Sequence, residues 1–492
     1  MHLVISIRRC GRILALIVAF VAVASGAFAA ETRRPNFIFL YADDQRWDAL
    51  GVVQREQGKQ ARFPWFQTPH LDRLAAGGVR FRNAFVVHSL CTPSRASFLT
   101  GRYTHSHGVA GNYTSFPPDA ANHGSLLRKA GYATAYIGKW HMGDGGGQRP
   151  GFEHSASYRG HGRYHDPVFE VDGREVVTKG WVDDVATDFA IDFIRKNRSR
   201  PFSMAVGFKS PHAEFVPPAR LRTTFAGEEL GPPPNWNNPA IYLGRVQLVQ
   251  SATIKPGGNR RVDDPLDYFR VIAGIDENVG RLLATLDELG LADDTMVIYS
   301  SDNGYHLGDH GIGDKRSAYE ESMRVPLLVR YPRLREMRGV TDDAMVLNID
   351  LAPTLLDFAG APPDPSMQGR SWRPILERRA NTIRDQFLYE YFFYPDISDY
   401  ELQTANCPIT PTITALRTAT AKLIAYPGRT WVELFDLRAD PHEKNNLARD
   451  PRHAALRREM EERLARELKA VDYRVPAGAG DVPLDGLEPW KR

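Results

Sequence analysis

Apolar runs alternate with amphipathic helical segments along most of this chain. Residues 37–41 form a continuous apolar run, and two acids follow it closely. Residues 202–208 and 295–299 are also mainly apolar and are followed by polar residues. Such runs are typical of strands buried on both faces of a parallel sheet. Helical patterns, clearest at 182–197 and 267–290, separate them. We therefore predict an α/β fold, with a mostly parallel sheet flanked by helices on both faces.

The pattern changes near residue 362, where the stretch GAPPDPSMQGRSWRP is typical of a linker. Beyond it, residues 386–394, 414–428 and 432–441 have the pattern of short antiparallel strands. Residues 453–471 follow as a charged amphipathic helix. We predict a main domain over 35–365 and a smaller α+β domain over 370–475.

The first thirty residues have the pattern of a secretory signal peptide. Arg8, Arg9 and Arg12 precede an apolar run over 13–24, and Ala27 and Ala29 form a small-residue cleavage pattern. We predict a signal peptide over 1–30 and export to the periplasm or the extracellular space. A retained anchor is the alternative, but the run is short for a membrane span, so we expect no stable membrane anchor. The arginine pair also permits a twin-arginine signal.

The net charge of +3 is close to balanced for 492 residues, so nothing indicates a nucleic-acid partner. Cleavage of the signal removes Cys10 and leaves Cys91 and Cys407. A disulfide between these two is one interpretation in an exported protein.

Cys91 stands directly before a helix signal in SLCTPSRASFLTGRY. Thr92 is a suitable N-cap, Pro93 suits the first helical position and Gly101 suits the exit. Cys91 and Arg95 then lie at the positive end of a short helix, which attracts anions.

Polar clusters follow four of the predicted strands. In a parallel sheet these positions share one edge, where ligands bind. Two clusters supply hard oxygen ligands, which suit Ca²⁺, or else Mg²⁺, better than zinc: Asp43, Asp44, Asp302 and Asn303. Acids that cap turns are the alternative for either pair alone.

The other clusters supply cationic or proton-transferring groups, namely Lys139, His141, His212 and Lys315. Each alone is compatible with a surface lysine or a loop histidine. Together with Arg95 they predict a cationic pocket that binds a tetrahedral oxyanion and stabilises charge on a leaving oxygen.

These motifs resemble those of the type I sulfatases, members of the alkaline-phosphatase superfamily. CTPSRASFLTGRY resembles the highly specific family signature, and ADD, GKWHMG, KSPH and SDNGYHLGDHG…DKRSAYEESMRVPLLVRYP resemble further blocks in the same order. LFDLRADPHEKNNLA resembles the usual C-terminal block. The resemblance covers about residues 35–449 and implies an alkaline-phosphatase-like fold.

The resemblance implies a sulfuric ester hydrolase in which Cys91 is oxidised to formylglycine (3-oxoalanine) by a formylglycine-generating enzyme. One hydroxyl of the hydrated aldehyde would attack sulfur and the other would then expel sulfate. It implies that Asp43, Asp44, Asp302 and Asn303, with the modified Cys91, hold Ca²⁺. Arg95 would stabilise the hydrate, Lys139 and His141 would contact it, and His212 and Lys315 would hold the sulfate. Which histidine is acid and which is base stays open.

The 301–330 block most resembles sulfatases of sulfated sugars, including N-acetylglucosamine-6-sulfatases, which implies a sulfated saccharide as substrate. His306, Asp309 and His310 are candidates to line the substrate side, with hydrogen bonding inside the loop as the alternative. Residues 154–167 are either an anionic-saccharide binding loop or a solvated one. Two rival functions stay open: a phosphonate monoester or phosphodiester hydrolase of the same superfamily, and a non-catalytic protein that binds sulfated glycans.

Overall fold

The computed structural model describes residues 34–143, 145–243, 264–394 and 410–480. The predicted signal peptide and Cys407 lie outside these ranges. Across the described ranges, none of the helices combines the length and the apolar character that crossing a membrane requires.

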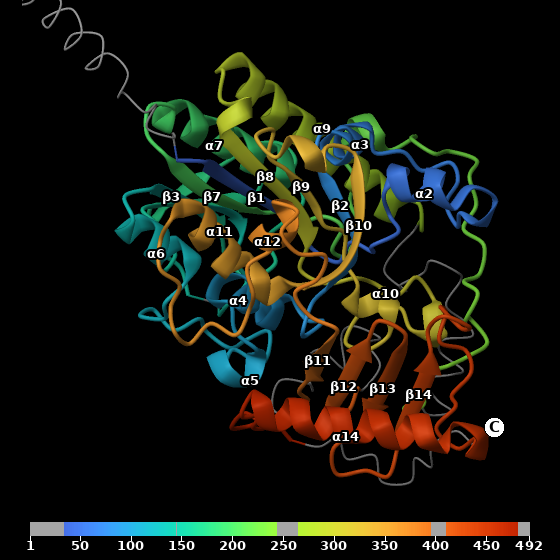
Figure 1. The fold of residues 1–492 in the computed structure, drawn as a ribbon. Helices are drawn as coiled ribbons and strands as arrows, with labels where there is room; N and C mark the ends of the chain where they lie inside the picture. Colours follow the sequence, from blue (N-terminus) through green and yellow to red (C-terminus); the bar gives the residue numbers. More distant parts are fainter. Residues whose placement is uncertain (1–33, 144, 244–263, 395–409, 481–492) are drawn as a thin grey trace, which may run out of the picture.

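A large mixed sheet forms the centre of the described molecule, with strand order β10-β2-β9-β8-β1-β7-β3-β4-β5-β6 (Figure 1). The strands are β1 (Asn36–Ala42), β2 (Val79–Phe85), β3 (Ala133–Lys139), β4 (His154–Tyr158), β5 (Val168–Val171), β6 (Arg174–Val177), β7 (Phe202–Gly207), β8 (Thr295–Ser301), β9 (Leu328–Arg330) and β10 (Val340–Leu347). The central run from β8 to β4 is parallel, and so is the β10–β2 pair. Antiparallel pairing is confined to β9, β5 and β6. The predicted mostly parallel sheet is confirmed.

Helices cover both faces of this sheet, because its central strands are apolar on both sides. In β1, Ile38 and Leu40 belong to the core under α3 (Pro69–Ala76), α7 (Val182–Asn197) and α9 (Asp267–Glu288). Phe37, Phe39 and Tyr41 point the other way, into the core under α4 (Cys91–Thr100), α6 (His123–Lys129), α11 (Leu351–Ala359) and α12 (Arg373–Leu376). Three further short helices are α2 (Gly51–Gln57), α5 (Thr104–His107) and α10 (Glu320–Met323).

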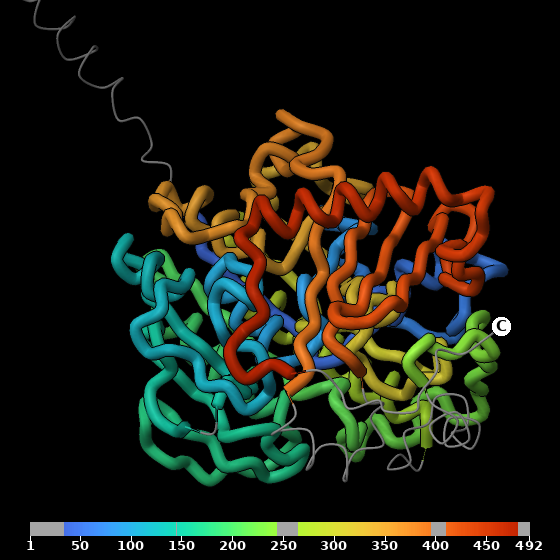
Figure 2. The backbone as a smooth tube through the Cα atoms, turned by 90° about the horizontal axis from the view of Figure 1, so that it is seen from below, coloured from blue at the N-terminus to red at the C-terminus, as the bar shows by residue number. Residues whose placement is uncertain are grey.

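A second, antiparallel sheet follows, as predicted, in the order β11-β12-β13-β14. Its strands are β11 (Gln386–Tyr391), β12 (Ile413–Thr418), β13 (Ala421–Ala425) and β14 (Val432–Asp436). The long helix α14 (Ala454–Ala470) lies along this sheet in both views (Figures 1 and 2) and buries Met460 and Leu464. One apolar core contains residues of both sheets, including Phe85 of β2 and Leu416 of β12, so the small sheet packs directly on the large unit.

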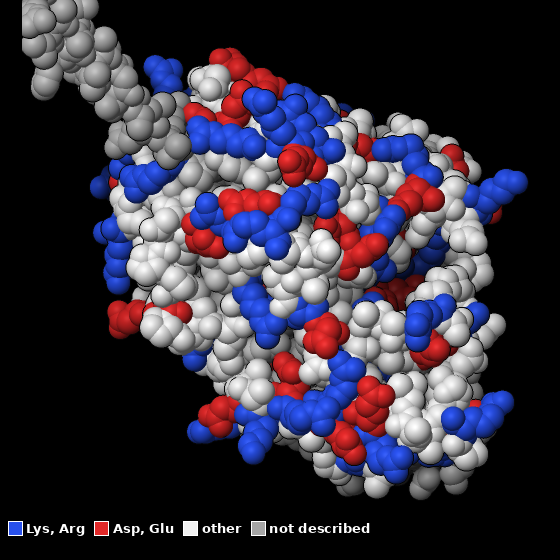
Figure 3. Space-filling model, viewed as in Figure 1, with Lys and Arg blue, Asp and Glu red and all other residues white. Residues whose placement is uncertain are grey.

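Positive and negative side chains alternate over the face shown in Figure 3 without a continuous area of one sign. That face therefore offers no extended basic surface of the kind that binds nucleic acid.

Candidate active site

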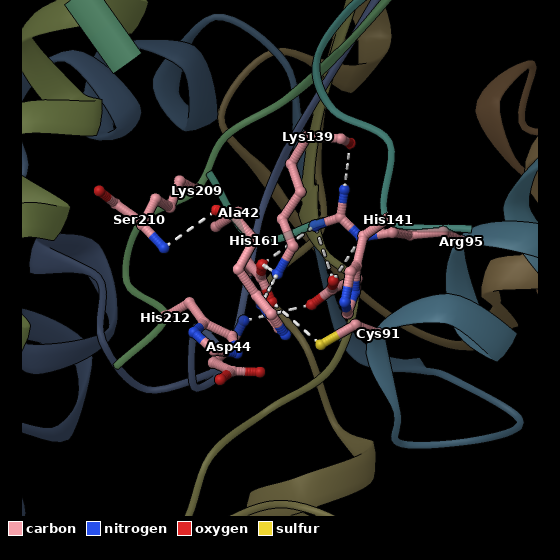
Figure 4. A network of polar contacts seen from close by, with 12 residues as sticks. Ala42, Asp44, Cys91, Arg95, Lys139, His141, His161, Lys209, Ser210 and His212 are labelled. Atoms are coloured by element: carbon pink, nitrogen blue, oxygen red, sulfur yellow. Dashed lines mark hydrogen bonds and ion pairs between the residues drawn. The ribbon is translucent and has the colours of Figure 1, made fainter. Parts of the chain in front are cut away.

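Four neighbouring strands deliver polar groups to one edge of the large sheet, as the sequence predicted. Strands β8, β1, β7 and β3 are adjacent and parallel, so their carboxyl ends point the same way. Their ends carry the pairs Asp302–Asn303 and Asp43–Asp44, the stretch Lys209–His212, and Lys139 with His141. Figure 4 shows side chains of these segments converging with Cys91 and Arg95 of α4.

Three buried carboxylates form the centre of this cluster. Asp43, Asp44 and Asp302 each place an oxygen within 4.8 Å of the others, and none is more than 2 % exposed. Asn303 donates to Asp44 Oδ1 over 2.6 Å, and its own Oδ1 is buried without a hydrogen-bond partner. A buried set of oxygen donors with one unpartnered amide oxygen fits a hard cation such as Ca²⁺ or Mg²⁺.

Three cations surround these carboxylates. Arg95 Nε donates to Asp302 Oδ2 over 2.8 Å, Lys139 pairs with Asp43, and Lys315 Nζ donates to both oxygens of Asp44 over 2.6 and 2.7 Å. Burial opposes ionisation of Asp43, but Lys139, Arg95 and Lys315 together hold its pKa well below the ordinary value. Burial and the neighbouring Asp43 raise the pKa of Asp302. The predicted cationic groups and the predicted metal ligands therefore form one interlocked cluster.

Cys91 is the first residue of α4 and lies against this cluster. It is a free cysteine with no exposed surface; its Sγ donates to Asp43 Oδ1 over 3.3 Å and accepts from Lys315 Nζ over 3.2 Å. Burial, reinforced by the charge of Asp43, raises the pKa of the thiol. A thiol held in its neutral form is a poor nucleophile, so the unmodified side chain is badly suited to attack at this position.

The predicted N-cap of this helix is wrong. The helix begins at Cys91, Leu90 occupies the cap position, and no side chain caps the first turn. Thr92 lies inside the helix, where its Oγ1 donates to the carbonyl oxygens of Asn112, over 3.2 Å, and His141. Its hydroxyl therefore ties the helix to the loop that carries His141. The predicted exit at Gly101 is confirmed, since this residue takes the left-handed conformation with φ 67°.

Arg95 holds the helix to three strand ends. Its side chain is fully buried, pairs with Asp302, and donates to the carbonyl oxygen of Lys139 over 2.6 Å. Its guanidinium also lies over the ring of Tyr41, 4.8 Å from the centroid. Arg95 thus connects α4 with the ends of β8, β3 and β1.

Three imidazole rings lie close together beside the carboxylates, tilted against one another, and the sequence predicted only two of them. The ring centroid of His161 lies 4.0 Å from that of His141 and 4.5 Å from that of His212. His161 Nδ1 is also 3.1 Å from Lys139 Nζ. Burial, followed by the positive charge of neighbouring groups, lowers the pKa of all three histidines well below the ordinary value.

Lys209, like His161, lies in this cluster, but the sequence analysis assigned it no role. Its Nζ donates to the backbone oxygen of His161 over 3.1 Å and lies 4.7 Å from the ring centroid of Tyr164. Burial, and then the charge of Lys139, lower its pKa to about 8. The contact between His161 and Lys209 depends on tertiary structure, because His161 lies in the loop after β4 and Lys209 follows β7. In the sequence, only the histidine-rich stretch 154–167 indicated a binding loop that contains His161.

His306, Asp309 and His310, the candidates for lining the substrate side, are buried in this structure. All three are at most 1 % exposed. Asp309 pairs with Arg46 and Arg62, His306 Nε2 lies 2.8 Å from Ser317 Oγ, and His310 Nδ1 lies 2.9 Å from the carbonyl oxygen of Asn238. These contacts are the hydrogen bonding within the protein that was the alternative, and the substrate role of the three residues stays a prediction.

Comparison with known proteins assigns the family. The sulfatase family model matches residues 35–361, and the model of the C-terminal region of N-sulphoglucosamine sulphohydrolase matches residues 308–470. This chain belongs to the sulfatase family. Members of this family hydrolyse sulfate esters. The polar cluster at the carboxyl ends of β8, β1, β7 and β3 is therefore the candidate active site of a sulfuric ester hydrolase.

Relatives of this sulfatase are similar over most of its length. The N-acetylglucosamine-6-O-sulfatase of Bacteroides thetaiotaomicron is 32% identical, with 87% of this chain and 85% of the relative covered. The N-acetylglucosamine-6-sulfatase of Homo sapiens is 31% identical, with 74% and 68% covered. A solved structure of a protein in complex with its substrate, D-glucosamine-2-N,6-O-disulfate, matches with a TM-score of 0.77 and 31% identity, covering 90% of this sulfatase and 99% of that chain.

The same fold occurs in the phosphonate monoester hydrolase of Agrobacterium radiobacter, with a TM-score of 0.70 and 23% identity over 89% of this sulfatase and 96% of that chain. This similarity confirms the alkaline-phosphatase-like architecture and carries no argument about substrate.

Proposed function

We propose that this sulfatase removes sulfate from sulfated carbohydrates, specifically the 6-O-sulfate of a glucosamine residue, with a formylglycine at position 91. The observation that carries the chemistry is the position of Cys91: a fully buried free cysteine, in contact with both Asp43 and Lys315, at the centre of the acidic and cationic cluster. The two N-acetylglucosamine-6-sulfatases and the glucosamine disulfate complex support the sugar.

The metal in this proposal is Ca²⁺, with Mg²⁺ as the substitute, and Asp43, Asp44, Asp302 and Asn303 would hold it. When bound, such a cation would polarise a sulfate oxygen and favour the anionic form of the nucleophile. Ion pairs with Arg95, Lys139 and Lys315 hold these carboxylates close together.

The formylglycine in this proposal arises when a formylglycine-generating enzyme oxidises the Cβ of Cys91 to an aldehyde. Its hydrate would supply a hydroxyl nucleophile together with a second hydroxyl that allows sulfate release without attack by external water. Cys91 opens α4, and Arg95, one turn later, holds that turn against Asp302. The helix therefore fixes where the reacting carbon lies.

The histidines are assigned to proton transfer. A ligand atom of His212 lies within 4.8 Å of atoms of both Cys91 and Asp43, close enough to serve a leaving alcohol. His212 Nδ1 is 2.5 Å from the carbonyl oxygen of Ala213, which fixes the ring with Nδ1–H donating and Nε2 free to exchange a proton. Nδ1 of His141 is buried without a partner, so this ring can serve the nucleophile side. Binding of an anionic sulfate ester would raise the lowered pKa values of these rings and permit acid catalysis.

The lysines are assigned to the sulfate group. Lys139 and Lys315 are at most 4 % exposed. Lys139 Nζ lies 3.1 Å from His161 Nδ1, and Lys315 Nζ donates to Cys91 Sγ over 3.2 Å. A preorganised set of buried cations stabilises negative charge that moves onto the sulfate and the leaving oxygen.

Export to the periplasm or the extracellular space, with loss of residues 1–30, completes the proposal, because sulfated polymers occur outside the cytoplasm. We further propose that residues 35–365 form the catalytic domain and 370–475 a C-terminal subdomain.

The test is sulfate release from a matched panel by protein coexpressed with a formylglycine-generating enzyme. We expect release from N-acetylglucosamine 6-sulfate and from 6-O-sulfated glucosamine, and little from the 3-O-sulfated isomer. Cys91→Ala should abolish release while the far-ultraviolet spectrum and the melting temperature stay near those of the wild type. Faster turnover of phenyl phosphonate than of every sulfated sugar would overturn the assignment in favour of the phosphonate hydrolase.

Metal removal provides a second test. A chelator should lower activity to near background, and excess Ca²⁺ should restore it. At a Ca²⁺ concentration 100 times the dissociation constant, binding should stabilise the fold by about 2.7 kcal/mol. Activity that persists after complete removal of divalent metals would exclude the metal role of the carboxylates.

A further inference from the structure

A second group of potential metal ligands lies apart from the residues of the proposed mechanism. His310, Glu321 and Glu443 each place a ligand atom within 4.8 Å of those of the other two, and all are at most 5 % exposed. The group joins three parts of the chain: the loop after β8, helix α10, and the segment after β14. It therefore lies where the large unit meets the C-terminal sheet.

His310 is oriented as a metal ligand would be. Its Nδ1 faces the carbonyl oxygen of Asn238 over 2.9 Å, so Nδ1 carries the proton and Nε2 carries the lone pair. Nε2 is buried without a hydrogen-bond partner, and the ring is fixed by stacking on Tyr319 with centroids 3.8 Å apart. Histidines that bind metals commonly donate their other nitrogen to a backbone carbonyl in this way.

Glu321 is a buried carboxylate that lacks a cationic partner. Its Oε1 accepts from Asn235 Nδ2 over 2.9 Å, whereas Oε2 has no hydrogen-bond partner and lies 3.9 Å from His310 Nε2. In the described ranges, no lysine or arginine pairs with it. A buried charge of this kind is costly unless a cation or a proton neutralises it.

Glu443 is the third potential ligand of this group. Glu443 is held by Lys422 Nζ over 2.7 Å and by the backbone N–H of Glu320 over 2.8 Å, which fixes its position. His310 and Glu443 line a cavity of about 370 Å³, which provides an entry path.

We propose that His310, Glu321 and Glu443 form a second cation site. One imidazole nitrogen with carboxylate oxygens favours Zn²⁺ or Mn²⁺ over Ca²⁺, which takes oxygen ligands almost exclusively. This site differs from the oxygen-only cluster of Asp43, Asp44 and Asp302 in ligand chemistry, so the two can be loaded separately.

The site would act as a structural connection. Lys315 of the active site lies between His310 and Glu321 in sequence, so a cation bound by these two residues closes the loop that carries Lys315. Glu443 joins the same cation to the C-terminal sheet. Loss of the cation should therefore lower the melting temperature.

The test is Zn²⁺ uptake by full-length protein that has been stripped with a chelator and then saturated with Ca²⁺. We expect one equivalent of Zn²⁺ to remain after gel filtration in excess Ca²⁺, measured by elemental analysis, with a rise in melting temperature. Co²⁺ in place of Zn²⁺ should give visible d–d absorption from a site with a nitrogen ligand. Glu321→Gln and His310→Gln should each lose the retained Zn²⁺ and the Co²⁺ bands.

Glu433→Gln is the matched control, because Glu433 is buried, lines the same cavity and is satisfied by the hydroxyls of Tyr319 and Tyr426. It should retain Zn²⁺. A wild-type protein that retains no Zn²⁺ between pH 6 and about 9 would overturn the proposal and leave a proton as the neutralising group. Equal retention by wild type and Glu321→Gln would also overturn it.

Discussion

Lys209 is a buried ammonium beside His161, and we expect its positive charge to attract the anionic sulfate ester. Because burial and Lys139 lower its pKa to about 8, it loses its proton as the pH rises through that value. We expect KM for a sulfated substrate to rise about 5- to 30-fold above pH 8, the equivalent of 1–2 kcal/mol of lost attraction. Lys209→Met should have a high KM already at pH 7 and no further rise near pH 8. Identical pH profiles of KM in variant and wild type would contradict this role.

His161 tests whether the third imidazole acts on the reaction. It lies between His141 and His212 and contacts Lys139, so its loss removes a hydrogen bond to a charged group. His161→Gln should lower kcat/KM about 10- to 100-fold, which corresponds to roughly 1.5–3 kcal/mol. His154→Gln is the control, since His154 belongs to the same histidine-rich stretch but pairs with Asp172 at the surface. Equal activities of the two variants would refute the assignment.

Candidate site residues were predictable from the sequence where they stand at the ends of predicted strands. Asp43, Asp302 and Lys139 directly follow or end apolar runs, so their common edge follows from the topology of a parallel sheet. Lys209 was predicted at a strand end but without a role, and His161 was not predictable, because its position depends on a loop packing across the strand ends. The ion pairs of Asp309 with Arg46 and Arg62 were not predictable either, because both arginines are distant from Asp309 in sequence.

At the scale of elements, the contact between β3 and β7 sets the position of Lys139. Gly138 has φ 83°, and an added Cβ would lie 2.1 Å from the carbonyl oxygen of Gly207 in β7. Gly138→Ala should therefore separate the two strands, lower the free energy of unfolding by more than about 3 kcal/mol and reduce kcat. Urea denaturation and steady-state kinetics measure both effects.

Gly131→Ala is the matched control for backbone strain alone. Gly131 has φ 85°, but the nearest atom to an added Cβ is on the flexible Arg34 side chain, 3.6 Å away. This variant should lose only about 1–2 kcal/mol and keep its kcat. Similar losses of stability and activity in the two variants would show that the strand contact has no special role.

The elements themselves were largely visible in the sequence. Apolar runs predicted β1, β7 and β8, because strands buried on both faces are apolar throughout. Helical periodicity predicted α7 and α9, because a helix that packs one face on the sheet repeats its apolar residues every three to four positions. The first turn of α4 was mispredicted, since Thr92 uses its hydroxyl in a tertiary contact with Asn112 and His141 that local preference does not encode.

For the whole molecule, Lys422 of β13 connects the C-terminal sheet to the segment that follows Lys315. Its fully buried Nζ donates to the carbonyl oxygen of Ala318 over 2.8 Å and pairs with Glu320 and Glu443 over 3.0 and 2.7 Å. Lys422→Met should lower the free energy of unfolding by about 3–5 kcal/mol, because it leaves Glu443 buried without its cation and Glu320 with Arg417 alone.

Arg195→Met is the control for this prediction, since Arg195 forms an exposed pair with Glu288 over 3.5 Å. Exposed pairs contribute about 0–1 kcal/mol, so this variant should be close to the wild type. A Lys422 variant as stable as the Arg195 variant in urea denaturation would show that the two sheets do not depend on this connection.

The large mostly parallel sheet and the small antiparallel sheet were predictable from the sequence, yet the core that they share was not. Phe85 and Leu416 pack in one cluster although more than three hundred residues separate them, and periodicity carries no information about such partners. The antiparallel β9 between parallel neighbours also depends on how distant strands pair.

The most direct measurement is the mass of the tryptic peptide that spans Cys91, residues 83–95, from active protein. The account predicts an aldehyde or its hydrate at residue 91, in a proportion that rises with specific activity across preparations. A cysteine thiol at this position in fully active protein would contradict it.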